Sequence, residues 1–120
     1  MKRVCLLAVV VAATATWTLV GSAQSPQTRS LYDRYTEPIE VFKNGLGSFT
    51  RPISSTNKEA QAFFDQGFQM MYAFAKPEAV RSFREAWKRD PQCAICYWGE
   101  AWAWGSYLNA PMRDEESPHA

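Results

Sequence analysis

The stretch that decides the fold is FFDQGFQMMYAFAKPEAVRSFREAWKRDP, residues 63–91. Its aromatic, small and proline residues stand at regular intervals: Phe63, Gly67, Ala79, Phe83, Ala86 and Pro91. An aromatic residue, a glycine, a second set of small and aromatic residues and a closing proline are typical of two helices packed as a hairpin. The sequence therefore predicts an all-α fold that begins with an antiparallel helical hairpin.

The first helix of this hairpin is predicted to begin at Thr56. Thr56 and Glu59 fit a capping box, in which each side chain satisfies a free backbone N–H of the helix start. Apolar residues then recur at helical spacing as far as Phe74. A glycine inside a helix costs about 1 kcal/mol relative to alanine, so Gly67 indicates close approach by a second helix.

The second helix is predicted to run from about Glu78 to Arg89. Ala75, Lys76 and Pro77 form the predicted turn, since proline suits the first position of a helix. A turn of three residues requires the two helices to be antiparallel.

A third helix is predicted to extend to about Leu108. Asp90 is its expected cap, and Pro91 is its expected first residue. Apolar residues lie nearly all round this helix, so several of its sides must be buried. The predicted hairpin can bury only one of these sides. Either the chain is the first piece of a longer array, or it self-associates through this aromatic helix.

The region before the hairpin, residues 24–55, is predicted to be an irregular leader. Asn44-Gly45 is a turn signal. A short β-hairpin over residues 39–49 and an ordered loop laid over the first helix both fit, and the loop is favoured. Pro52 ends any regular element.

The first 23 residues have the three parts of a secretory signal peptide. Lys2 and Arg3 precede the uncharged apolar run 4–20, and small residues end it at Ala23, where cleavage is expected. The alternative is an uncleaved membrane anchor. The predicted domains are thus a signal peptide (1–23), the leader (24–55) and a helical region (56–120) of an exported, periplasmic or secreted protein.

Charge argues against nucleic acid as a partner. Loss of Lys2 and Arg3 leaves 11 basic and 12 acidic residues, a net charge of −1, without a basic block. Cleavage also leaves two cysteines, Cys93 and Cys96, and an even pair in an exported protein is compatible with a disulfide.

Cys93 and Cys96 are the sharpest candidates for chemistry. At a helix start, free N–H groups lower the pKa of a thiol, which would suit a redox pair. A redox pair of the thioredoxin type needs a strand–helix context, however, and one CxxC supplies only half a zinc site. The remaining interpretation, a local disulfide or two small packing residues, is favoured. We assign no catalytic residue, metal or cofactor.

Aromatic residues on the third helix allow two interpretations. They form the series Tyr97, Trp98, Trp102, Trp104 and Tyr107. Such residues line carbohydrate or peptide grooves, but at this spacing core packing against a following repeat is favoured.

Residues 46–112 resemble the tetratricopeptide-repeat (TPR) superfamily, and more narrowly the opening of exported bacterial TPR proteins. The shared phrase is FFDQG…YAF…EA…SFREA…DP.CA..YWG.A.A.G. The chain departs from the general pattern at Gln66, where leucine is usual, at Met70, where tyrosine is usual, and after Leu108, where the pattern stops. The resemblance implies one full repeat and part of a second, acting as a protein- or peptide-binding scaffold without enzymatic activity. The alternative function is extracytoplasmic thiol redox or metal handling by Cys93 and Cys96.

Overall fold

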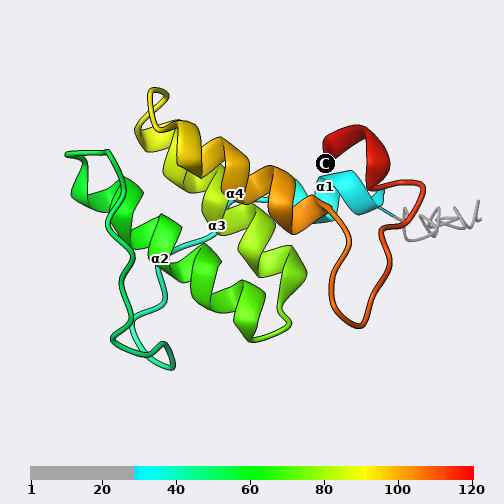
Figure 1. Cartoon of the computed structure of the whole chain (residues 1–120), viewed down its shortest axis with the longest axis horizontal. Coiled ribbons are helices and arrows are strands. Elements are labelled where there is room, and N and C mark those ends of the chain that lie inside the picture. Colours follow the sequence, from blue (N-terminus) through cyan, green and yellow to red (C-terminus); the bar gives the residue numbers. More distant parts are fainter. Residues whose placement is uncertain (1–28) are drawn as a thin grey trace, which may run out of the picture.

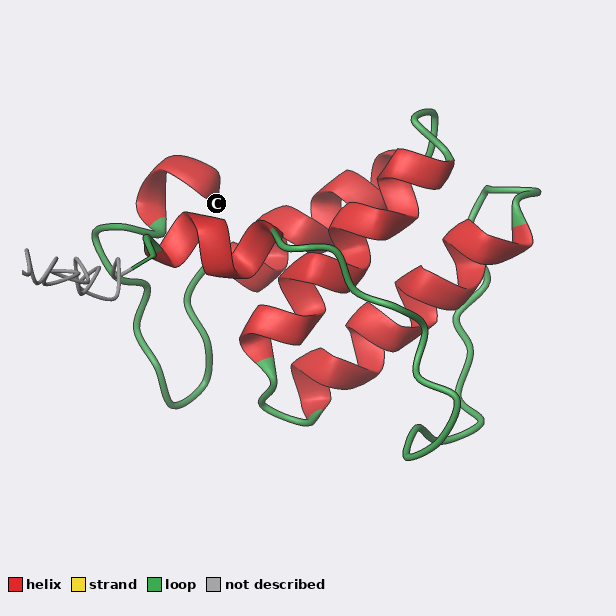
Figure 2. Cartoon of the chain, turned by 180° about the vertical axis from the view of Figure 1, so that it is seen from behind, coloured by secondary structure: helices red, strands yellow, loops and turns green. Residues whose placement is uncertain are grey.

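The computed structural model describes residues 29–120, so the predicted signal peptide lies outside the described residues. Within them the fold is all-α, as predicted, with no β-strand and one isolated bridge between Tyr107 and Ala110 (Figures 1 and 2). The helices are α1 (Leu31–Thr36), α2 (Lys58–Tyr72), α3 (Lys76–Arg89), α4 (Ala94–Trp104) and the short 3₁₀ helix η1 (Ser117–His119).

Helix α2 begins one or two residues later than predicted, because Asn57 rather than Thr56 caps it. The Asn57 side-chain oxygen accepts from the backbone N–H groups of Glu59 and Ala60, at 2.9 and 3.2 Å. Its amide nitrogen donates to the carbonyl of Arg89, 3.0 Å away. An amide carries both an acceptor and donors, so Asn57 starts α2 and ties it to the end of α3 at once.

Helices α2 and α3 form a hairpin whose turn is Ala73–Ala75, two residues earlier than predicted (Figure 1). Phe74 takes the left-handed backbone conformation there, with φ 62°. Helix α3 starts at Lys76, so Pro77 lies inside its first turn, where a missing N–H costs nothing.

Helix α4 is shorter at both ends than the predicted third helix. Asp90 ends α3 by donating its N–H to Ala86, and its side chain accepts from the N–H of Gln92, so it does not cap α4. Pro91 lies exposed in this turn, and Cys93 occupies the cap position. Gly105 ends the helix by donating its N–H to the carbonyls of Ala101 and Trp102.

The core is centred on Phe83, which is fully buried between α2 and α4. A Cβ atom added at Gly67 would lie 2.9 Å from the Phe83 ring, and one at Gly99 would lie 2.5 Å from it. Both glycines therefore make room for the ring, so that α3 is flanked by α2 and α4 (Figure 1). The interpretation of Gly67 as a site of close helix approach is consistent with this packing.

Over residues 29–55 the leader is an ordered loop, apart from helix α1, and the hairpin considered for residues 39–49 does not form. Helix α1 was not predicted. Ser30 caps it by accepting from the N–H of Asp33, 3.1 Å away. It packs on α3, where Tyr35 is only 4% exposed.

Buried Gln66 fastens the leader to the hairpin. Its side-chain nitrogen donates to the carbonyl of Glu40 and to the hydroxyl of Ser82, both at 3.0 Å. Its side-chain oxygen accepts from the N–H of Phe42, 2.7 Å away. The glutamine that departs from the TPR pattern thus holds the leader's backbone, a task that leucine cannot perform.

Candidate functional site

Aromatic rings from three separate segments form a continuous row on one side of the molecule. We call it the aromatic groove: Phe49 of the leader, Phe68 and Tyr72 of α2, and Trp98 and Trp102 of α4. Ring centroids are 5.5 Å apart for Phe49–Phe68, 5.7 Å for Phe68–Trp102 and 5.4 Å for Trp98–Trp102. Tyr72 contacts both Phe68 and Trp102.

The groove is open to solvent. Phe49, Tyr72 and Trp98 are 54%, 68% and 51% exposed, respectively. A depression of about 430 Å³ lies at one end of the groove, lined by Phe49, Phe68, Gln69 and Tyr72. Clustered exposed aromatic surface of this kind marks interaction sites more often than it marks ordinary surface.

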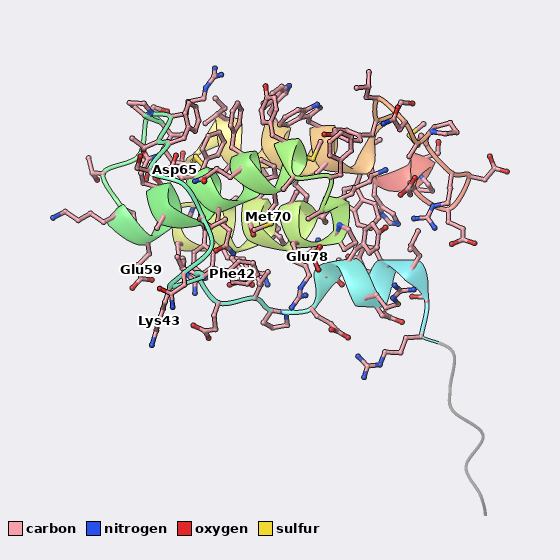
Figure 3. The ribbon with its side chains drawn as sticks, turned by 90° about the horizontal axis from the view of Figure 1, so that it is seen from below. Phe42, Lys43, Glu59, Asp65, Met70 and Glu78 are labelled. Carbon is pink, nitrogen blue, oxygen red and sulfur yellow. A yellow bond between two sulfur atoms is a disulfide. The ribbon has the colours of Figure 1, made fainter. Side chains whose placement is uncertain are left out.

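Two polar residues of α2 hold Phe49 in place. Gln69 donates to the carbonyl of Phe49, 3.1 Å away. Asp65 accepts from the hydroxyl of Thr50 at 2.6 Å and from the N–H of Arg51 at 2.8 Å. Figure 3 shows the leader passing α2 at Phe42 on one side and Asp65 pointing to the other, so the leader wraps around the helix before it delivers Phe49.

Polar groups of the groove lack partners within residues 29–120. The indole N–H groups of Trp98 and Trp102 and the hydroxyl of Tyr72 make no hydrogen bond there, although no buried side-chain nitrogen or oxygen in this part of the chain is unpaired. Tyr72 and Trp98 are exposed side chains, and the indole nitrogen of the half-buried Trp102 is not fully buried. By contrast, the indole N–H groups of Trp87 and Trp104 both donate to Glu100.

One positive charge borders the groove. The guanidinium of Arg51 lies 5.6 Å from the centroid of the Phe68 ring, a distance at which a cation is attracted to the ring face. Arg51 forms no ion pair with any residue from 29 to 120.

Cys93 and Cys96 are joined by a disulfide across the first turn of α4, with their Cα atoms 5.4 Å apart. The two residues are 1% and 0% exposed. Thiol–disulfide exchange requires an attacking thiolate to reach a sulfur atom, and burial prevents that approach. The arrangement fits a structural crosslink that fixes the start of α4.

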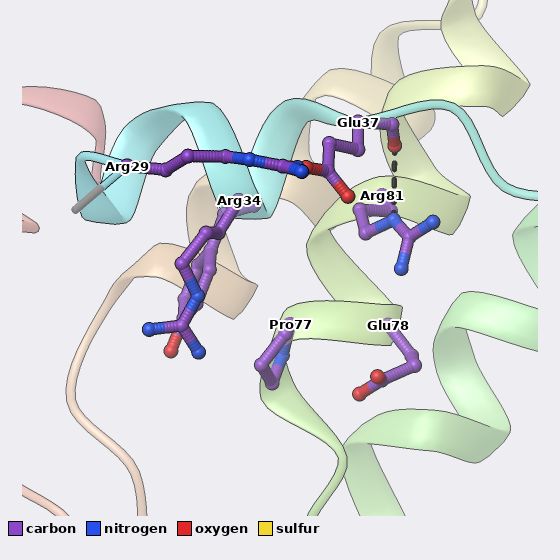
Figure 4. Close-up of a pocket in the computed structure, with 7 residues that line it drawn as sticks. Arg29, Arg34, Glu37, Pro77, Glu78 and Arg81 are labelled. Atoms are coloured by element: carbon purple, nitrogen blue, oxygen red, sulfur yellow. Dashed lines mark hydrogen bonds and ion pairs between the residues drawn. The ribbon is translucent and has the colours of Figure 1, made fainter. Parts of the chain in front are cut away.

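A second depression, of about 470 Å³, lies between α1 and the start of α3 (Figure 4). Three of its five charged groups hold α1: Arg81 donates to the carbonyl of Glu37 at 2.9 Å, and Arg29 pairs with the Glu37 carboxylate. Its lining has no Ser, Thr, Cys or His side chain, and among residues 29–120 no three His, Cys, Asp or Glu side chains are placed to hold a metal.

The residues identified from the sequence lie in different environments in the structure. Phe63, Gly67, Ala79, Phe83 and Ala86 are buried packing residues, whereas Pro91 is exposed. The aromatic series divides among several environments. Trp104 is buried in the core, Trp98 and Trp102 belong to the groove, Tyr97 stacks on Trp87, and Tyr107 contacts Phe74.

Sequence reasoning missed three of the five groove residues. Phe68 and Tyr72 stand four residues apart on α2, which puts them on one helical edge, and that spacing was a usable signal. Phe49 comes from a loop 19 residues before Phe68. The loop has no periodic pattern, so the position of Phe49 in the groove follows only from the folded structure.

No protein-family model, curated protein or solved structure matches this chain. In the described part of the chain, no helix combines the length and apolarity needed to cross a bilayer.

Proposed function

We propose that this chain is the N-terminal part of an exported TPR-like scaffold that binds a peptide segment of a partner protein in the aromatic groove. The short α2–α3 hairpin, the glycine contacts on both sides of Phe83 and the motif resemblance support the TPR-type architecture. A helical repeat presents its ligands on a surface built from successive helices, and the groove joins α2 to α4 in that manner.

The observation that carries the proposal is the groove's exposed aromatic row. Tryptophan and tyrosine dominate the binding energy of protein interfaces, because they bury a large area at little entropic cost. Here three of the five rings are at least half exposed, whereas among the other aromatic side chains of residues 29–120 only Phe74 is exposed to that extent. A partner would cover the rings and supply acceptors for their N–H and O–H groups.

The thiol alternative receives no support from the site. Both sulfur atoms are buried and bonded to each other. A buried local disulfide instead suits the oxidising compartment that the predicted signal peptide implies.

Selection from a random peptide library tests the proposal. The purified chain is used to select phage-displayed 12-residue peptides, with the Trp98→Ala variant for counter-selection. We expect enriched peptides that bind the wild-type chain at least tenfold more tightly than Trp98→Ala, the effect of about 1.4 kcal/mol. Tyr97→Ala, a neighbouring exposed residue that stacks on Trp87 outside the groove, is the matched control.

Two results would count against the groove. The first is failure to enrich any peptide on the wild-type chain over Trp98→Ala. The second is equal loss of binding in Tyr97→Ala and Trp98→Ala while circular dichroism shows both variants folded.

A further inference from the structure

We infer that the segment bound by the groove is a proline-containing peptide in the polyproline II conformation, with an acidic residue that meets Arg51. This inference rests on the proposed function and names the class of ligand that the groove recognises.

The fold disfavours the other common modes of peptide recognition. Addition of a β-strand needs an unpaired sheet edge, and residues 29–120 contain no strand. A docked α-helix is 10–12 Å across with its side chains and needs a long groove between helices. The hollow part of the groove, about 430 Å³ lined by Phe49, Phe68, Gln69 and Tyr72, does not reach Trp98 or Trp102, so it is short for a helix and adequate for an extended chain.

The hydrogen-bond donors of the groove that lack partners among the described residues suit a ligand whose backbone carbonyls are free to accept. Polyproline II has no internal hydrogen bonds, so each of its carbonyl groups is available as an acceptor. Trp98, Trp102 and Tyr72 each combine a donor without a partner among the described residues with an aromatic face. Grooves that bind proline-rich peptides pair these two features, because proline rings pack on aromatic faces while the adjacent carbonyls accept hydrogen bonds.

The dimensions agree with a short segment. The row from Phe49 through Phe68 and Trp102 to Trp98 has three steps of 5.4 to 5.7 Å between ring centroids. At a rise of 3.1 Å per residue, a polyproline II chain laid along it spans at most about five residues.

Charge complementarity selects an acidic residue in the ligand. The five groove residues carry no charge, and the Arg51 guanidinium beside Phe68 is without an ion pair in the described chain. The Asp65 carboxylate accepts from the Thr50 hydroxyl, the backbone N–H of Arg51 and the Gln61 amide, and it forms no ion pair with the Arg51 guanidinium. An acidic side chain of the ligand would therefore give Arg51 the ion pair that it does not form with any residue from 29 to 120.

A linear carbohydrate is the competing ligand for an aromatic row. Sugars require several polar side chains to bind their hydroxyls, and the groove offers few: Gln69 uses its amide nitrogen on Phe49. The groove's composition thus favours the peptide, and the experiment includes a sugar.

The test measures affinities of the purified chain for defined probes by isothermal titration calorimetry. The probes are the acetylated, amidated peptides PPPEPPP, PPPKPPP, GSGEGSG and VTVEVTV, and cellohexaose. We expect PPPEPPP to bind at least tenfold more tightly than GSGEGSG, and more tightly than PPPKPPP. Arg51→Gln should abolish the difference between PPPEPPP and PPPKPPP.

Two conservative variants test the donors. Trp98→Phe and Tyr72→Phe keep a ring and remove the N–H or O–H, and each should weaken PPPEPPP by about three- to tenfold, the effect of one hydrogen bond. Tyr97→Phe, which removes a hydroxyl outside the groove, should leave the affinity unchanged.

The outcomes separate the two proposals. If VTVEVTV or the phage-selected peptides bind and PPPEPPP does not, the ligand class is wrong and the scaffold remains. If no peptide binds, or only cellohexaose does, both proposals are overturned.

Discussion

Phe83 is the residue on which the three main helices meet. Its ring fills the space that side chains at positions 67 and 99 would otherwise occupy, and it packs edge-on against Phe64 with centroids 5.4 Å apart. Interiors are packed to crystal-like density, so neither glycine can gain a methyl group unless the ring moves.

Gly99→Ala is therefore expected to destabilise the fold by about 1–2 kcal/mol. Overpacking costs about 1–3 kcal/mol, and the better helix propensity of alanine returns up to about 1 kcal/mol. Gly67→Ala should cost less, because its added Cβ would lie 2.9 Å rather than 2.5 Å from the ring. Urea unfolding followed by circular dichroism measures both.

Gly47→Ala is the control for these variants, since its nearest neighbour would be a Gln69 side-chain oxygen at 3.5 Å. Equal stability of Gly99→Ala and the wild-type chain would show that Phe83 has room to shift.

Single residues also show where sequence reasoning works. Phe63, Phe83, Ala79 and Ala86 were identified as packing residues from spacing alone, and they are buried. The role of Gln66 was out of reach, because its backbone partners stand 24 and 26 residues earlier in a loop without periodicity.

At the scale of elements, the three long helices were predictable and their ends were not. Periodicity marks the body of a helix, but the ends depend on competing caps. Asn57 displaces Thr56 because it also binds Arg89, and Gly105 stops α4 four residues before the last predicted position, 108. Helix α1 has only six residues, too few for a periodic signal, and packing on α3 stabilises it.

The disulfide at the start of α4 is expected to resist chemical attack while the chain is folded. With dithiothreitol and iodoacetamide in native buffer, Cys93 and Cys96 should remain unlabelled in the peptide detected by mass spectrometry, because both are buried. The same reagents in concentrated urea should label both residues fully. Rapid labelling in native buffer would restore the thiol alternative.

At the scale of the whole molecule, the C-terminal segment closes the end of the fold near α1. The carboxylate of Glu116, 1% exposed, pairs with Lys76 at 2.9 Å and accepts from the N–H of Arg113 at 2.7 Å. The ring of His119 then contacts Tyr32 and Trp104. One buried carboxylate thus connects the tail, α3 and, through Arg113 and the Tyr35 hydroxyl, α1.

This connection should weaken in acid. Burial alone would raise the pKa of Glu116, but hydrogen bonds from Arg113 and Lys76 outweigh it, so the pKa lies below its ordinary value. A carboxyl with a lowered pKa stabilises the fold above the unfolded-state pKa of about 4.3 and loses that contribution as the pH falls through the folded-state pKa.

Glu116→Gln should therefore lower stability at pH 7 and flatten its dependence on pH below about 4.5. Thermal unfolding of both proteins from pH 3 to pH 7 measures the effect. Parallel pH profiles for the variant and the wild-type chain would contradict it.

The leader is attached to α2 at two places, and this predicts how the folded chain responds to cleavage between them. Gln66 holds residues 40 and 42, Gln69 and Asp65 hold residues 49–51, and between them Lys43 and Asn44 are exposed. Because Lys58 is also exposed, limited digestion with a lysine-specific protease is followed by mass spectrometry. The product cut only after Lys43 should give two bands on a denaturing gel but one peak on size exclusion. Separation of the fragments would show that the attachments are too weak. We therefore expect residues 29–43 and 44–120 to stay associated through non-covalent contacts after the peptide bond between them is cut.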